Sequence, residues 1–172
     1  MAAAAAELVS GTDVGAAQGA AGASQGAAGS PAAVSLPALL RAARVPYAIA
    51  VREALVAHGM DDVPQNGSFV IVAASRNRAV LGGLVRWLAV SKQAVGQLVD
   101  LLEDRGYLYR SPDPADRRRT MLILTARGET AAAAINVAVR GVDDRLAAQV
   151  GAQDVATARR VLGTLAVMGR IE

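Results

Sequence analysis

Residues 91–106 read SKQAVGQLVDLLEDRG, and this stretch decides the fold. Its larger aliphatic residues recur at spacings of three and four, which is the period of a helix with one buried face. They are Val95, Leu98, Val99 and Leu102. Ser91 is placed to cap the first turn, and Gly106 supplies the left-handed residue that closes a helix. The sequence therefore predicts an amphipathic helix over 91–105 with a polar outer face.

The outer face of this helix carries amide and amine side chains near its start, namely Lys92, Gln93 and Gln97. Glutamine side chains are suited to the edge of adenine, and lysine to guanine or a phosphate. Gly96 lowers helix propensity, and close approach to the floor of a DNA groove could offset that cost. Taken alone, such a polar face is more often simply solvated.

A basic hairpin follows the helix. Residues 107–110 and 120–124 are β-prone, and they flank a loop that reads SPDPADRRR. Arg117, Arg118 and Arg119 stand together near its tip, where Asp116 can pair with Arg118 and hold it extended. The narrow minor groove of DNA offers the strong negative potential that such a tip requires. A polar helix followed by a basic hairpin predicts a DNA-reading unit.

Apolar helices are expected on both sides of this unit. One spans residues 36–58 with Pro46 inside it, and we expect the proline to kink or split that helix. Short helices are expected over 69–74 and 80–88. Two more are expected after the hairpin, one starting at Thr125 as its cap and one over 154–168. Their apolar stripes are too extensive for a lone subunit in water, which predicts a dimer.

Composition narrows the classes of protein. Residues 1–35 are almost entirely small or polar, so we expect a disordered Ala/Gly-rich tail. The net charge is +3, and residues 61–127 hold ten basic against seven acidic side chains. The chain has no cysteine and one histidine, so no metal site, thiol chemistry or other cofactor is predicted.

At this point the sequence resembles a known family. From Leu84 to Gly128 it is similar to the MarR family, in LVRWLAVSKQAV at 84–95, LVDLLEDRG at 98–106, DPADRR at 113–118 and LTARG at 124–128. The resemblance implies a mainly α fold with a small β-hairpin wing, a winged helix-turn-helix between N- and C-terminal dimerisation helices. Its segments would be the tail (1–35), the N-terminal dimerisation helix (36–60), the DNA-binding domain (61–127) and the C-terminal dimerisation helices (128–172).

The resemblance also implies roles for particular residues. Residues 91–105 would be the recognition helix, and Asp116 with Arg118 would form the wing-tip pair that enters the minor groove. The DNA-binding residues are therefore expected to be Ser91, Lys92, Gln93, Gln97, Asp116, Arg117, Arg118 and Arg119. In this family a small aromatic or anionic effector enters a crevice beside the dimer helices. Tyr47, Arg52 and His58 are the candidates to contact it.

We therefore expect a bacterial transcriptional regulator, a repressor, that binds double-stranded DNA at an inverted repeat as a homodimer and is released by an effector. An enzyme is not expected, because no catalytic or phosphate-cradling pattern occurs and no catalytic residue is predicted. No apolar stretch is long enough to cross a membrane, and the start of the chain lacks the basic region of a signal peptide, so we expect a cytoplasmic protein. The alternative left open is a nucleoid-type architectural DNA-binding protein without effector control.

Overall fold

The computed structural model describes residues 34–76, 84, 91–114, 116 and 119–168. The chain divides into two units, residues 1–39 and residues 40–172. Of the first unit, only residues 34–39 are described, and residues 36–39 already belong to the first helix. All but the last two residues of the tail expected over 1–35, and most of the helix expected over 80–88, therefore lie outside the described residues.

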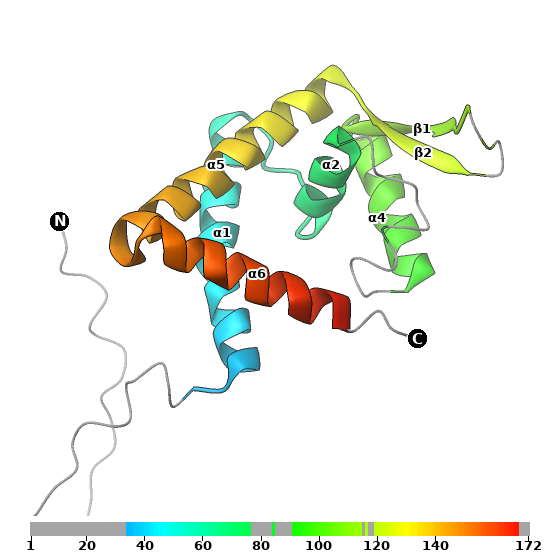
Figure 1. The fold of residues 1–172 in the computed structure, drawn as a ribbon. Helices are drawn as coiled ribbons and strands as arrows, with labels where there is room; N and C mark the ends of the chain where they lie inside the picture. Colours follow the sequence, from blue (N-terminus) through cyan, green and yellow to red (C-terminus); the bar gives the residue numbers. More distant parts are fainter. Residues whose placement is uncertain (1–33, 77–83, 85–90, 115, 117–118, 169–172) are drawn as a thin grey trace, which may run out of the picture. The chain divides into compact units, whose positions relative to one another are not determined.

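The described residues form helices and one two-stranded sheet (Figure 1). In chain order they are helices α1 (Leu36–Ala57), α2 (Gly67–Ser75) and α4 (Lys92–Asp104), strands β1 (Leu108–Pro112) and β2 (Thr120–Leu124), and helices α5 (Ala126–Val150) and α6 (Ala152–Met168). The predicted fold class, mainly α with a small β-hairpin, is confirmed.

Helix α1 passes through Pro46 as one continuous helix of 22 residues. Of the two outcomes expected at Pro46, a kink or a split, the split is therefore wrong. Proline removes one backbone N–H from a helix, and here it lies on an exposed stretch where water can bond to the carbonyl group left without a partner. The helix buries Leu55 near its end, and Gly59 then adopts a positive φ of 68° as the chain turns.

The core lies between α2, α4 and α5. Val70 and Ile71 of α2 are fully buried, as are Val95, Val99 and Leu102 of α4. Each such burial stabilises the fold by roughly 1.5–3 kcal/mol. The three buried residues of α4 belong to the stripe predicted from the sequence, and Leu98 packs against the core partly buried. The predicted inner face of α4 is confirmed.

The hairpin is antiparallel, with Leu108 opposite Leu124 and Pro112 opposite Thr120. The second strand coincides with the prediction. The first begins one residue later and ends two residues further on. Tyr107 precedes it because its N–H still bonds to the carbonyl oxygen of Leu102 at the end of α4. Proline can stand at the end of a strand, where its missing N–H leaves no ladder bond unmade.

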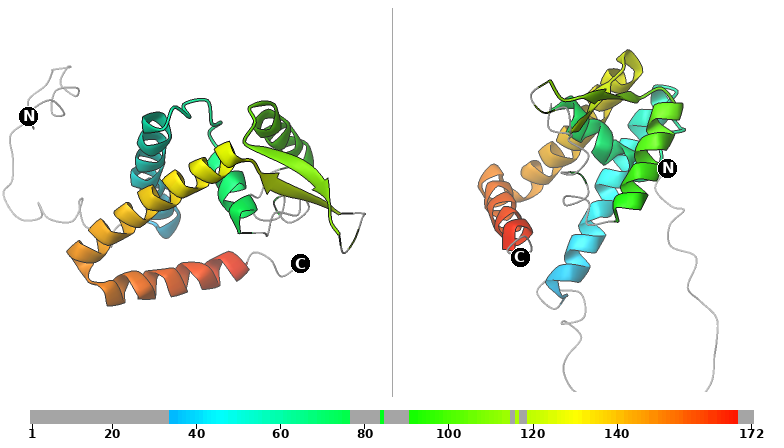
Figure 2. Two further views of the ribbon diagram at one scale, coloured as in Figure 1. Left: turned by 90° about the horizontal axis from the view of Figure 1, so that it is seen from above. Right: turned by 90° about the vertical axis from the view of Figure 1, so that its right-hand side faces the viewer.

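Helix α5 begins against the end of α4. Thr125 caps it as predicted, with its Oγ1 accepting a hydrogen bond from the N–H of Gly128 at 3.1 Å. A Cβ at Gly128 would lie 1.9 Å from the carbonyl oxygen of Tyr107, so only glycine allows this close approach. Figure 2 shows the hairpin leading directly into α5, beside α2.

Helix α6 follows Gly151, which has a positive φ of 88°, and folds back on α5 (Figure 2). None of its residues is buried. Its exposed large apolar side chains are Val161, Leu162, Leu165, Val167 and Met168. Within the described part of the chain, no helix combines the length and the hydropathy that a membrane span requires.

Candidate nucleic-acid interface

The start of α4 presents a polar, exposed surface. Ser91 caps the helix, and its Oγ accepts a hydrogen bond from the N–H of Ala94 at 3.1 Å. Lys92, Gln93 and Gln97 are all exposed, whereas Val95 between them is fully buried. The inner stripe therefore holds the helix in the core while the predicted DNA-binding residues face outward.

The first turn of α4 also suits an approaching anion. It contains no acidic residue, and the helix start carries a partial positive charge from its unpaired N–H groups. A Cβ added at Gly96 would meet no atom within 4 Å, so the described residues leave open space around this position. Lys92 adds a full positive charge at the same end.

The wing tip is closed by backbone bonds and an ion pair. The N–H of Asp113 donates to the carbonyl oxygen of Arg119 at 3.0 Å, and the N–H of Arg119 donates to that of Asp116 at 2.8 Å. The Nε of Arg119 lies 3.2 Å from Oδ2 of Asp116. The predicted partner of Asp116 was Arg118, which lies outside the described residues together with Arg117.

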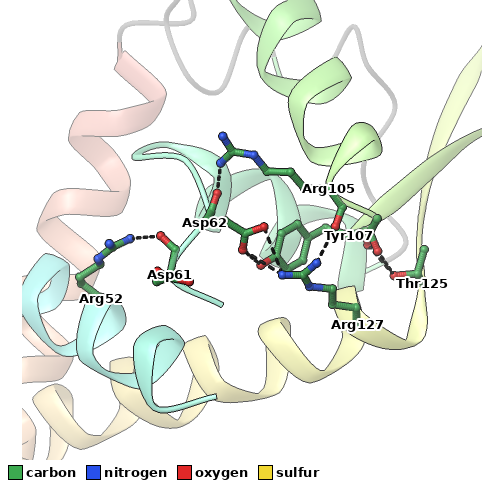
Figure 3. A network of polar contacts seen from close by, with 8 residues as sticks. Arg52, Asp61, Asp62, Arg105, Tyr107, Thr125 and Arg127 are labelled. Carbon is green, nitrogen blue, oxygen red and sulfur yellow. Dashed lines mark hydrogen bonds and ion pairs between the residues drawn. The ribbon is translucent and has the colours of Figure 1, made fainter. Parts of the chain in front are cut away.

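A second polar network joins the base of this unit to its surroundings, and sequence reasoning missed it. Asp62, in the loop after α1, accepts a hydrogen bond from the hydroxyl of Tyr107 at 2.5 Å. It also pairs with Nη2 of Arg127 at 3.0 and 3.1 Å to its two carboxylate oxygens. Figure 3 shows these side chains converging from the loop, from the junction between α4 and β1 and from the start of α5.

Arginine side chains extend the network (Figure 3). Arg127 donates to the carbonyl oxygen of Arg105 at 3.0 Å, and its guanidinium lies over the ring of Tyr107, 4.5 Å from the centroid. Arg105 donates to the carbonyl oxygen of Asp62, and Arg52 donates to that of Asp61 at 2.6 Å. The loop after α1 is thereby tied to the end of α4.

These contacts shift two pKa values in opposite directions. The hydrogen bond from Tyr107 lowers the pKa of Asp62 more than burial raises it, and the charge of Arg127 adds a further lowering effect. Burial, together with the hydrogen bond to Asp62, raises the pKa of Tyr107 to about 12. Asp62 is thus held as a carboxylate and Tyr107 as a neutral donor over the whole ordinary pH range.

The three effector candidates are not brought together by the structure. The hydroxyl of Tyr47 donates to Oδ1 of Asp143 at 2.7 Å, and this hydrogen bond is the main reason that the pKa of Tyr47 is raised. Arg52 holds the loop at Asp61, and Nδ1 of His58 lies 2.8 Å from the carbonyl oxygen of Ala54. Their predicted role in binding an effector stays a prediction. In the described ranges, no three His, Cys, Asp or Glu side chains gather as metal ligands.

Comparison with known proteins shows what this part of the chain is similar to. Residues 72–119 match the model of the MarR family, so the predicted resemblance is confirmed over that segment. A MarR-family transcriptional regulator from Rhodococcus sp. RHA1 has a similar structure, with a TM-score of 0.62 and 23% identity over 76% of this chain and 93% of that one. No curated protein matches the chain.

Two further solved structures share the fold. One is NadR in complex with 4-hydroxyphenylacetate, with a TM-score of 0.66 and 22% identity over 81% of this chain and 95% of that one. The other is a mutant MarR from E. coli complexed with operator DNA, with a TM-score of 0.60 and 21% identity over 76% of this chain and 92% of that one. These likenesses show that the chain shares the winged helix-turn-helix fold of these solved structures.

Proposed function

Because residues 72–119 match the MarR family, we propose that this chain is a sequence-specific regulator of transcription that binds double-stranded DNA. The observation that carries the proposal is the start of α4, where Lys92, Gln93 and Gln97 stand exposed on a helix whose opposite face is locked in the core. A MarR protein of the same fold has been solved with operator DNA, which supports this function.

In the proposed complex, α4 lies in the major groove. This groove admits one helix and exposes a distinct pattern of donors and acceptors for each base pair. Gln93 and Gln97 would bond to base edges, while Lys92 and the capped helix start would meet guanine or phosphate. The wing would follow the backbone to the next minor groove with Arg119 and its neighbours Arg117 and Arg118.

We further propose that the protein acts as a homodimer through α1, α5 and α6. These helices expose large apolar side chains that a lone subunit leaves in water, including Ile49 of α1, Val137 of α5 and Val161 of α6. A two-fold dimer places its recognition helices about 34 Å apart, one turn of the duplex, and selects an inverted repeat. Such binding over a promoter blocks transcription, so the proposed role is that of a cytoplasmic repressor.

A small aromatic or anionic effector is proposed to release the DNA. NadR, which shares the fold, has been solved with 4-hydroxyphenylacetate, a compound that is both aromatic and anionic. Tyr47 and Arg52 would have to exchange their present partners, Asp143 and the carbonyl group of Asp61, for such a ligand. That exchange supplies a way for binding to disturb the loop that contacts the end of α4.

Selection of bound duplexes from a random pool tests the function. We expect the parent protein to recover an inverted repeat, and Gln93→Ala or Gln97→Ala to relax the preference at one base pair of each half-site. The loss of affinity for the best site should be about 1–3 kcal/mol. Gln149→Ala is the matched control, because Gln149 is an exposed glutamine of α5, outside the helix and wing proposed to contact DNA.

The same selection separates the two kinds of DNA-binding protein. A parent protein that enriches no sequence, and coats DNA with an affinity set by salt alone, would be an architectural binder. An enriched repeat that stays unchanged in both glutamine variants would mean that α4 does not read bases. Failure to bind duplex DNA at all would overturn the proposed function.

A further inference from the structure

Arg110 of β1 reaches back to the recognition helix and bonds to two of its carboxylates. Its Nη2 lies 2.5 Å from Oδ1 of Asp100, and its Nη1 donates to Oε2 of Glu103. The backbone N–H of Arg110 also donates to Oε1 of Glu103 at 3.1 Å. One residue of the wing is thereby joined to α4 by its main chain and by both ends of its guanidinium group.

The geometry of the two acidic residues suits this arrangement. Asp100 and Glu103 are three positions apart in α4, so their side chains lie on the same side of the helix. The side chains of Glu103 and Arg110 are each only about a third exposed, at 34% and 31%. Charged hydrogen bonds of a planar guanidinium are strong and directional, and Glu103 receives two donors from a single residue.

Attraction to the phosphates of DNA does not explain why α4 carries these carboxylates. A helix that lies against the phosphates of DNA loses affinity for every negative charge it carries nearby. Yet α4 holds Asp100, Glu103 and Asp104 in its second half. Two of the three are bonded to Arg110, whose positive charge is thereby engaged within the protein.

We propose that Asp100, Glu103 and Arg110 form a positioning clamp that fixes the wing against the recognition helix, so that both can meet one duplex together. This inference rests on the proposed DNA-binding function. In the clamp, Arg110 makes no phosphate contact, and the two carboxylates contribute to affinity through geometry although their charge opposes it. The clamp residues are positioning residues and do not read bases.

Neutralising these carboxylates provides a test, because the clamp and a purely electrostatic effect predict opposite changes in DNA affinity. The double variant Asp100→Asn/Glu103→Gln makes the protein more positive by two charges per subunit. If the carboxylates were only surface charges, affinity for DNA would rise. The clamp predicts that affinity for the selected site falls about tenfold, while affinity for unrelated DNA stays the same or rises, so that the ratio of specific to non-specific affinity drops.

Two single variants sharpen the result. Arg110→Lys keeps the charge but lacks the planar fork that spans two carboxylates, and we expect it to lower the specific affinity as well. Asp104→Asn is the matched control, because Asp104 is an exposed carboxylate of the same helix with no ion pair to any described residue. It should leave the specific affinity unchanged or slightly raised. Thermal unfolding is measured for each variant, and its midpoint should stay close to that of the parent.

A distance measurement in the absence of DNA tests the clamp independently of the proposed DNA-binding function. The chain has no cysteine, so Gln93→Cys with Arg119→Cys gives two unique spin-label positions, one on α4 and one at the wing tip. Labelled chains are diluted with unlabelled chains, so that only the distance within one subunit is recorded. We expect a narrow distance distribution, and a clearly broader one when Asp100→Asn/Glu103→Gln is added.

Each outcome decides the matter. An unchanged width in the double variant overturns the clamp, whatever the protein does with DNA. A broader distribution with undiminished specific affinity also overturns it, because the wing would then not need to be positioned. A parent protein that binds no duplex refutes the proposed function, and the label distances then still decide whether the clamp holds the wing.

Discussion

Gly96 shows how a single residue can serve binding at the expense of stability. It lies inside α4 between the two glutamines, and a methyl group there would meet no described atom within 4 Å. Alanine favours a helix by about 1 kcal/mol over glycine. Gly96→Ala should therefore raise the free energy of unfolding by about 0.5–1 kcal/mol and lower DNA affinity, because the methyl group would stand in the groove.

Chemical denaturation and DNA titration of the same preparation measure both effects. Gly141→Ala is the control, since Gly141 lies inside α5 and an added methyl group would meet only Nη1 of Arg145, at an ordinary contact distance of 3.9 Å. That variant should gain stability and keep its DNA affinity. A Gly96→Ala protein that binds DNA as tightly as the parent would contradict close approach of α4 to the groove.

Tyr107 gives the protein a dependence on alkaline pH. Its pKa in the folded state is about 12, above the ordinary value of 10.0, so the folded protein keeps this proton longer than the unfolded chain. The resulting stabilisation is complete below about pH 10 and is lost as the pH rises toward 12. Two pKa units correspond to about 2–3 kcal/mol.

Denaturation curves at several alkaline pH values test this expectation. Tyr107→Phe should be less stable than the parent near neutrality, and the difference between the two should shrink by about 2 kcal/mol across that interval. Asp62→Asn should narrow the pH range over which this stabilisation is lost, because it removes the charged acceptor that helps to raise the pKa of Tyr107. A constant difference between Tyr107→Phe and the parent at every pH would show that the buried hydroxyl is not the group responsible.

At the scale of elements, the wing combines a rigid base with an exposed tip. Arg119 is exposed over 61% of its side chain, so its ion pair with Asp116 contributes little to stability. Arg119→Ala should leave the melting temperature almost unchanged. It should lower DNA affinity several-fold and flatten the dependence of affinity on salt, because each phosphate that the protein no longer neutralises takes about one unit from that slope.

The matched control for the wing is Arg160→Ala, which removes the same charge from an exposed position of α6. If net charge alone governed binding, the two variants would lose affinity equally. If the wing touches DNA, only Arg119→Ala changes the salt dependence. Equal salt slopes for Arg119→Ala and the parent would place the wing tip away from the phosphates.

At the scale of the whole molecule, α6 carries the clearest sign of a partner. Val161, Leu165 and Met168 repeat at helical spacing, and each is more than two-fifths exposed. A carboxylate cannot be buried without a partner in such an apolar surface. Leu165→Glu should therefore convert the dimer into monomers and weaken binding to an inverted repeat at least tenfold.

Sedimentation at micromolar concentration measures the oligomeric state. Gln153→Glu adds the same charge to the exposed first turn of α6, where a negative charge is favourable, and it should remain dimeric. A parent protein that sediments as a folded monomer would remove the basis for paired recognition helices. If the Leu165→Glu protein remains a dimer, the dimer interface must be formed by α1 and α5 instead of α6.

Local sequence patterns were sufficient to predict α4 and the caps of α4 and α5. The aliphatic spacing over 91–105 predicted the buried face of α4, Ser91 and Thr125 were recognised as caps, and Gly106 indeed has a positive φ of 70°. These features depend on residues within one or two turns of each other, so the chain order alone contains them.

What only the tertiary structure decided are the contacts between distant segments. The sequence offered no reason to connect Asp62 with Tyr107 and Arg127, which lie 45 and 65 positions away, or to expect two carboxylates of α4 around Arg110. It also left open whether Pro46 kinks or splits the first helix, and α1 runs through it without a split. Propensity and periodicity describe a segment and its neighbours, whereas the partner of a charged side chain is settled by how the packed core brings the ends of its helices together.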